Sequence, residues 1–162
     1  MSENLRLSQV RGNVKAGDSS TGIIVVVIGF FVAVFMVGVL AAIAIPNFIT
    51  VQLKAKRSEV PGNVDGIRTA ELAYKAAFDT YVPIGRPALS VGKDQRPWEG
   101  GANWEALGWR PDGNVRGAYW VEVEGDHFTV HGICDVDGAG EVAEYVADEN
   151  TNATLVSDRN TY

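Results

Sequence analysis

The sequence predicts an α+β fold in which one long N-terminal helix, half transmembrane and half amphipathic, packs on a three- or four-stranded antiparallel sheet. Three observations carry this prediction. Residues 19–53 contain no Asp, Glu, Lys or Arg, apolar positions recur at spacings of three and four over 67–81, and apolar residues alternate with polar ones from residue 115 onward. An apolar helix stripe and an apolar sheet face each need a cover, and each can cover the other.

Residues 23–45 are predicted to span a membrane. Apart from Gly29 and Gly38 the stretch is wholly apolar, and about 20 apolar residues let a helix cross a hydrocarbon core of about 30 Å. Secretory signal peptides have a shorter core, of about 7–15 residues. A buried core helix is the alternative, but such helices rarely run so far without a charge. The preceding residues 1–22 are polar, as in a cytoplasmic tail or a leader.

The orientation is predicted from the length of the C-terminal part. Basic residues flank the span on both sides, so the positive-inside rule does not decide. They are Arg6, Arg11 and Lys15 before it, and Lys54, Lys56 and Arg57 after it. Long domains are translocated largely regardless of charge. We therefore expect the N-terminus in the cytoplasm and the C-terminal domain outside, with the basic residues 54–57 beside lipid headgroups.

The helix is predicted to continue over 46–81 as its amphipathic half, with a kink or break near Pro61. Proline removes a backbone N–H, and Gly62 adds flexibility. Beyond this point apolar and charged positions follow helical spacing. The apolar stripe consists of Ile67, Ala70, Tyr74, Ala77 or Phe78, and Tyr81, whereas Arg68, Glu71, Lys75 and Asp79 are assigned to the solvated face.

Residues 82–114 are predicted to form a loop, because Pro and Gly punctuate the segment throughout. Trp98, Trp104 and Trp109 lie within it. The simpler interpretation is that these side chains pack against the helix stripe. The alternative is that they form the stacking surface of a ligand site.

Residues 115–162 are predicted to form the antiparallel sheet of the head. The apolar positions of 115–123 share one parity, a turn at 125–126 follows, and the alternation resumes over 128–134. A further strand is expected at 142–149, and 153–158 could add an edge strand.

Charge and cysteine content exclude two classes of protein. The formal net charge of −6 belongs mostly to the head, and an acidic domain with few basic clusters argues against nucleic-acid binding. Cys134 is the single cysteine, so no internal disulfide staples the domain. Its position in a strand-like run is typical of a small buried residue.

The acidic turn 135–141 raises the question of a metal site. Asp135, Asp137 and Glu141 or Glu144 could converge on one hard cation such as calcium. The favoured alternative is a hairpin turn that uses Asp for side-chain capping and Gly for positive φ. No other cofactor is predicted.

No catalytic site is predicted. His127 and His131 lie four residues apart on a strand, hence about 13 Å apart, and do not chelate one metal by themselves. No phosphate-binding loop and no nucleophile motif is present. The chain is therefore not expected to be an enzyme.

Pro46 falls where the predicted helix leaves its apolar run. Its missing N–H leaves a carbonyl one turn earlier without a helical donor and loosens the helix there. Small residues at Gly38, Ala41 and Ala42 let neighbouring helices approach closely. Together with Phe48, these are the candidate residues for helix packing and assembly.

The stretch 38-GVLAAIAIPNFI-49 resembles the N-terminal helix of type IV pilins and of the related pseudopilins of type II secretion. The similarity continues at Gln52, Ala55, 57–59 and 67–81, and segments 107–123 and 131–140 look similar to pilin heads. The resemblance implies a pilin-like fold, a long helix whose second half packs on an antiparallel sheet. It also implies polymerisation through the hydrophobic helix halves after extraction from the bacterial inner membrane.

Two features of the pilin pattern are missing from this chain. Pilins carry a Gly just before the mature N-terminus and a Glu seventeen residues before the helix proline, and these positions hold Ile24 and Gly29 here. Gly22 and Gly29 are alternative cleavage points, but neither is followed by Glu. The resemblance therefore implies the fold without implying ordinary processing.

We thus expect a non-enzymatic structural subunit of a pilus or secretion pseudopilus, with a minor or tip role as one option. Its expected partners are other pilin-type subunits and the assembly platform of the inner membrane. It would be a single-pass inner-membrane protein with a periplasmic head, or part of an extracellular pilus if processed. The alternative is a permanently anchored periplasmic binding module with a pilin-like fold that does not polymerise.

Overall fold

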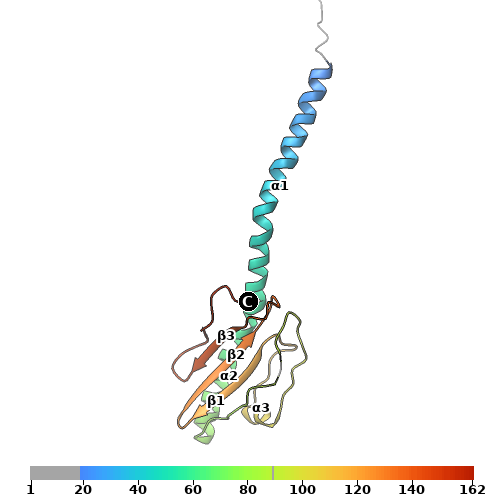
Figure 1. Cartoon of the computed structure of the whole chain (residues 1–162). Coiled ribbons are helices and arrows are strands. Elements are labelled where there is room, and N and C mark those ends of the chain that lie inside the picture. The colour runs from blue at the N-terminus through green and yellow to red at the C-terminus, as the bar shows by residue number, and fades with distance from the viewer. Residues whose placement is uncertain (1–18, 89) are drawn as a thin grey trace, which may run out of the picture. The chain divides into compact units, whose positions relative to one another are not determined.

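The computed structural model describes residues 19–88 and 90–162 (Figure 1). The chain divides into two compact units, Met1–Pro46 and Asn47–Tyr162, which we call the N-terminal unit and the head. Most of the tail or leader predicted at 1–22 lies outside the described residues. Helix α1 runs from Ser19 to Arg57 with Pro46 inside it, so the backbone stays helical past the proline.

Helix α2 spans Glu59–Phe78 and follows α1 after an interruption at Ser58. The Ser58 N–H still donates to the Lys54 carbonyl at 3.0 Å, so the helical pattern persists up to this point. Pro61 lies in the first turn of α2, where its missing N–H deprives the Arg57 carbonyl of its helical donor. The helix ends earlier than the predicted residue 81, because Asp79 adopts a left-handed conformation with φ of 59°.

The sheet of the head has four antiparallel strands in the order β1-β2-β3-β4, as predicted for a meander; β1, β2 and β3 are labelled in Figure 1. The strands are β1 (Ala118–Glu124), β2 (His127–Cys134), β3 (Ala143–Asp148) and β4 (Thr154–Leu155). Gly125 has φ of 62° in the tight turn between β1 and β2, which suits glycine. The predicted α+β class, a long N-terminal helix packed on an antiparallel sheet, is confirmed.

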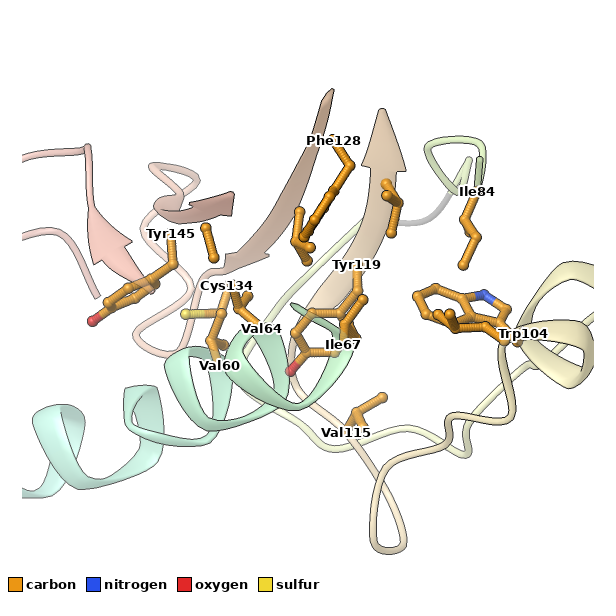
Figure 2. Packing of buried hydrophobic residues seen from close by; sticks show 14 of the residues in the cluster. Val60, Val64, Ile67, Ile84, Trp104, Val115, Tyr119, Phe128, Cys134 and Tyr145 are labelled. Carbon is orange, nitrogen blue, oxygen red and sulfur yellow. The ribbon is translucent and has the colours of Figure 1, made fainter. Parts of the chain in front are cut away.

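Helix α2 covers the sheet with a seam that overlaps the predicted stripe: Ile67 is buried, and Ala70, Tyr74 and Tyr81 pack partly buried against the core. Its buried residues are Val60, Val64, Ile67 and Glu71, at spacings of four, three and four, whereas Phe78 is exposed. In Figure 2 the three apolar side chains of the seam point toward residues of β1 and β2. Gly132 of β2 makes the approach possible, because a Cβ there would lie 2.9 Å from a methyl group of Val60.

The segment 82–114 is more ordered than the predicted loop. Helix α3 (Ala102–Leu107) lies within it, and buried Trp104 and Leu107 anchor this helix to the core. Two isolated bridges, Ile84 with Val121 and Arg96 with Val115, tie the segment to β1 and to the residues just before it. The backbone groups at this edge of the sheet are thereby partly paired, which limits edge-to-edge association.

The junction between α1 and α2 is held by two charged side chains. Arg57 is buried at 8% exposure, donates to the carbonyls of Arg159 and Thr161, and lies 5.1 Å from the ring centre of Tyr162. Glu59 accepts the Arg116 N–H at 2.7 Å. These contacts connect the start of the head to segments about 100 and 57 residues further along the chain.

Candidate functional site

The apolar surface of α1 is the largest candidate functional feature. All large apolar side chains from Ile23 to Val51 are 44–71% exposed. Soluble monomers rarely expose an apolar surface of this extent. By length and composition α1 could cross a membrane, and its most apolar window is not buried by any described residue. This surface therefore requires lipid or other helices as its cover.

Three small residues of α1 share one side of this surface. Gly38, Ala41 and Ala42 are three and four positions apart, which places them on one helix face. A Cβ at Gly38 would meet nothing within 4 Å, so the face is open to a neighbour. Small residues at this spacing let two helix backbones approach closely in lipid.

The remaining predicted residues of α1 are also exposed. Pro46 is the last residue of the N-terminal unit, and Phe48, 62% exposed, belongs to the head. Gly22 and Gly29, the alternative cleavage points, both lie inside the helix and have open space where a Cβ would be. A peptidase would need this part of the helix to unwind before it could cleave after either glycine.

The predicted loop tryptophans come together in the head. Trp98 lies 5.0 Å from Trp104 and 5.5 Å from Trp109 between ring centres, and Trp109 also approaches Tyr119. Edge-to-face and tilted arrangements of this kind stabilise by about 0.5–1.5 kcal/mol per pair. The cluster packs on α2, since Trp109 fills the space beside Gly66 at the point where a Cβ would sit 2.8 Å from its Nε1.

The same tryptophans line a cleft of about 460 Å³ on the surface of the head. Trp98 and Trp109 are half-buried, and Glu105 and Arg110 provide charged groups at its walls. The structure thus places the three predicted residues both in the core and at the edge of a cleft.

A second aromatic group, on the other face of the sheet, was missed by the sequence analysis. The Trp120 indole stacks on the His131 imidazole with 4.7 Å between centres and 1° between planes. The Arg86 guanidinium lies 4.6 Å from the Trp120 ring, and His131 is hydrogen-bonded to Glu144 at 3.0 Å. The alternation on β1 could have indicated Trp120, but its partner Arg86 lies 34 residues earlier and carries no local signal.

The acidic turn is organised by its own backbone. The Asp135 carboxylate accepts N–H groups of Gly138, Ala139 and Gly140, and Asp137 accepts the Ala139 N–H at 3.0 Å. Glu141 is exposed, and Glu144 is occupied by His131. Within residues 19–88 and 90–162, no three His, Cys, Asp or Glu side chains converge as a metal site would require.

Glu71 was predicted on the solvated face of the helix, but this prediction is wrong because the side chain is buried. Its carboxylate accepts the Val82 N–H at 2.9 Å, while Oε1 has no hydrogen-bond partner among the described residues. Burial raises the pKa of Glu71 to about 7, against the opposing effect of the Val82 N–H. The carboxyl thus links α2 to the chain that follows it.

Cys134 is buried at the end of β2, and burial raises the pKa of its thiol to about 12. A thiol with so high a pKa is almost wholly protonated at neutral pH and is therefore a poor nucleophile. Its position fits the predicted role as a small core residue.

Comparison with known proteins finds a partial similarity to a type IV pilin. The chain is 41% identical over 54 residues to the type IV major pilin protein PilA of Myxococcus xanthus (strain DK1622). The match covers 33% of this chain and 24% of that protein, so the chain spans about a quarter of the length of this curated relative. No family model matches the chain, and no solved structure matches it significantly. The chain is thus similar to a type IV pilin over a third of its length, and its apolar helix and α+β head agree with a pilin-like protein.

Proposed function

We propose that this protein is a non-enzymatic structural subunit that assembles through α1 into a pilus or a secretion pseudopilus. The observation that carries the proposal is the apolar, charge-free surface of α1, exposed from residue 23 to residue 51 and joined to a folded head. The partial similarity to a major pilin supports the same function. Its proposed partners are pilin-type subunits and the inner-membrane platform that assembles them.

The charge-free part of α1 suits transfer between lipid and a protein filament. Residues 23–45 extend over about 34 Å of helix, enough for a hydrocarbon core of about 30 Å. Leaving the bilayer would expose this surface to water unless helices of other subunits cover it at once. The face formed by Gly38, Ala41 and Ala42 offers a close approach for such a helix.

A matched pair of substitutions tests this assembly surface. Ala42 and Ala33 lie nine residues apart, which places them on opposite sides of α1 at 100° per residue. Ala42→Leu should remove the protein from sheared surface filaments while leaving its amount in the membrane unchanged. Ala33→Leu makes the same chemical change on the other side and should leave assembly intact. Equal loss, or no loss, in both variants would contradict the proposed face.

The second candidate function is a permanently anchored, periplasmic binding module that keeps the pilin fold. Two observations favour it, the cleft of about 460 Å³ beside Trp98, Trp104 and Trp109 and the absence of a Glu at position 29. In this case the head would bind a ligand at the tryptophan cleft and the helix would only anchor it. Such a protein would stay in the membrane fraction when surface filaments are sheared off.

A further inference from the structure

Trp120 lies between two side chains that can carry positive charge. In the register of the sheet it is directly opposite His131 of β2, and the two rings stack with 4.7 Å between their centres. Along its other edge β1 is bridged by Ile84, one of residues 84–88, which we call the strap. The Arg86 guanidinium of the strap lies 4.6 Å from the centre of the Trp120 ring. The contacts come from opposite edges of β1, so the indole separates the imidazole from the guanidinium.

The stack is fixed in place and partly shielded from water. Trp120 is 4% exposed, and its indole N–H donates to the Glu122 carboxylate at 3.1 Å. The side chain of His131 is 17% exposed. Because the indole excludes water from the space between them, a charge on the imidazole and the charge on the guanidinium interact more strongly than two charges on an open surface.

The charged groups that face His131 come from three elements. Glu144 of β3 lies 3.0 Å from Nδ1, Glu122 of β1 lies 3.9 Å from Nε2, and Arg86 of the strap lies across the indole. Imidazole side chains commonly change charge between about pH 5 and 8. Once His131 is protonated, both carboxylates can pair with the imidazolium, whereas the guanidinium repels it.

The size of this repulsion follows from the two contacts. Distances of 4.6 and 4.7 Å to the Trp120 ring put the two charges no more than about 9 Å apart. Arg86 is exposed, so an effective dielectric constant of about 40–80 is appropriate for its charge. At this distance Coulomb's law then gives a repulsion that changes an equilibrium constant about twofold to fivefold.

We propose that protonation of His131 loosens the strap, so that its attachment to the edge of β1 depends on pH. The strap is attached by two backbone hydrogen bonds of 2.9 Å between Ile84 and Val121 and by the contact of Arg86 with Trp120. Loosening it uncovers backbone groups at the outer edge of β1, where another strand could pair. By linkage, the Arg86 contact weakens proton binding at His131 by the same factor. The inference concerns the head alone and does not depend on assembly through α1.

Titration of the imidazole NMR signals of the full chain in detergent micelles tests the coupling. Arg86→Gln should raise the midpoint of the His131 titration by about 0.3–0.7 pH unit, the equivalent of a twofold to fivefold change in proton affinity. His127 is an internal control, because it pairs with Glu149 at the start of the same strand and should not shift. Lys93→Gln makes the same charge change beside Gly138 and should leave the His131 midpoint within about 0.1 pH unit.

Hydrogen exchange at the Ile84 N–H tests the strap itself. The exchange rate of the wild type is divided by that of His131→Gln at the same pH, which cancels the intrinsic pH dependence of exchange. This ratio should rise about twofold to fivefold between pH 8 and pH 5, since the glutamine cannot be protonated. The measurement keeps Arg86 in place, so it holds even if Arg86→Gln detaches the strap.

Three results would overturn the inference. The first is a His131 midpoint that does not change in Arg86→Gln. The second is an equal shift of that midpoint in Lys93→Gln, which would assign the effect to the overall charge of the head. The third is a ratio of Ile84 exchange rates that is the same at pH 8 and pH 5.

Discussion

The burial of Glu71 predicts an unusual dependence of head stability on pH. The side chain is 0% exposed, and only one of its carboxyl oxygens has a hydrogen-bond partner among the described residues. Its pKa is raised from 4.5 to about 7, mainly by burial. The perturbation that isolates this carboxyl is Glu71→Gln, which keeps the shape of the side chain and removes its ionisation.

The direction and size of the effect follow from the raised pKa. Between about pH 4.5 and 7 the folded head holds a proton on Glu71 that the unfolded chain has lost, so the free energy of unfolding falls as pH rises. The stabilisation of the folded head by protonated Glu71 is fully present below about pH 4.5 and is lost above about pH 7. The change over this range is at most about 3 kcal/mol, since a tenfold change in an equilibrium constant corresponds to about 1.4 kcal/mol.

Urea unfolding of the full chain in detergent micelles measures this dependence. All four tryptophans lie in the head, so their fluorescence reports the unfolding of this unit. From pH 5 to 8 the wild-type free energy of unfolding should fall by about 2–3 kcal/mol, and Glu71→Gln should remove most of that slope. The wild type and Glu71→Gln are compared by the slope of the free energy of unfolding against pH and not by its absolute value. The new amide leaves a buried N–H group without a partner and therefore lowers stability at every pH.

His127 provides the necessary control, because its hydrogen bond with Glu149 raises its pKa as well. The stability that protonated His127 adds to the folded head is also lost as pH rises through its folded-state pKa. Its titration therefore lowers the free energy of unfolding in the same direction as that of Glu71. His127→Gln should leave the slope between pH 5 and 6 unchanged. If Glu71→Gln keeps the full wild-type slope, the assignment of the titration to this carboxyl is refuted.

Three further predictions concern packing, the helix junction and metal binding. Gly132→Ala should lower the free energy of unfolding by about 1–3 kcal/mol, because its Cβ would intrude on α2, whereas Gly85→Ala, in open space, should change it by less than about 0.5 kcal/mol. Arg57→Ala should lower it by about 2 kcal/mol, through loss of the buried charged donors to two carbonyls, as measured by the urea midpoint. Calcium at about 5 mM should shift the Tm by less than roughly 1 °C relative to EDTA, because the Asp135 carboxylate is already used by backbone N–H groups, and a larger rise would indicate a metal site at the turn.

The elements that sequence patterns predict are those fixed by local periodicity. The charge-free run of α1 and the alternation in β1 and β2 are visible within windows of about 10–20 residues. The acidic turn was also predictable in its favoured interpretation, since the capping of Asp135 arises within six residues. Helix α3 was missed because glycines flank it on both sides and no capping side chain marks its start.

Features that depend on which surfaces meet were not predictable to the same degree. Glu71 was assigned to the solvated face because it shares spacings of three and four with charged residues such as Arg68 and Lys75. It also continues the spacing of the buried residues Val60, Val64 and Ile67. That second pattern decides burial only once the sheet is known to contact this side of α2. The contact depends on Gly132, 61 residues after Glu71, which leaves room for the helix. The gathering of Trp98, Trp104 and Trp109 into one cluster likewise depends on the folded chain.

The mass and N-terminal sequence of the native protein show whether α1 carries the protein into a filament. The measurement compares the protein in the membrane with that in sheared surface filaments. We expect protein in the filaments whose N-terminus lies between residues 23 and 30, after removal of the polar leader. Protein that keeps residues 1–22 and is absent from the filaments would contradict it, and the anchored binding module would then be the better description.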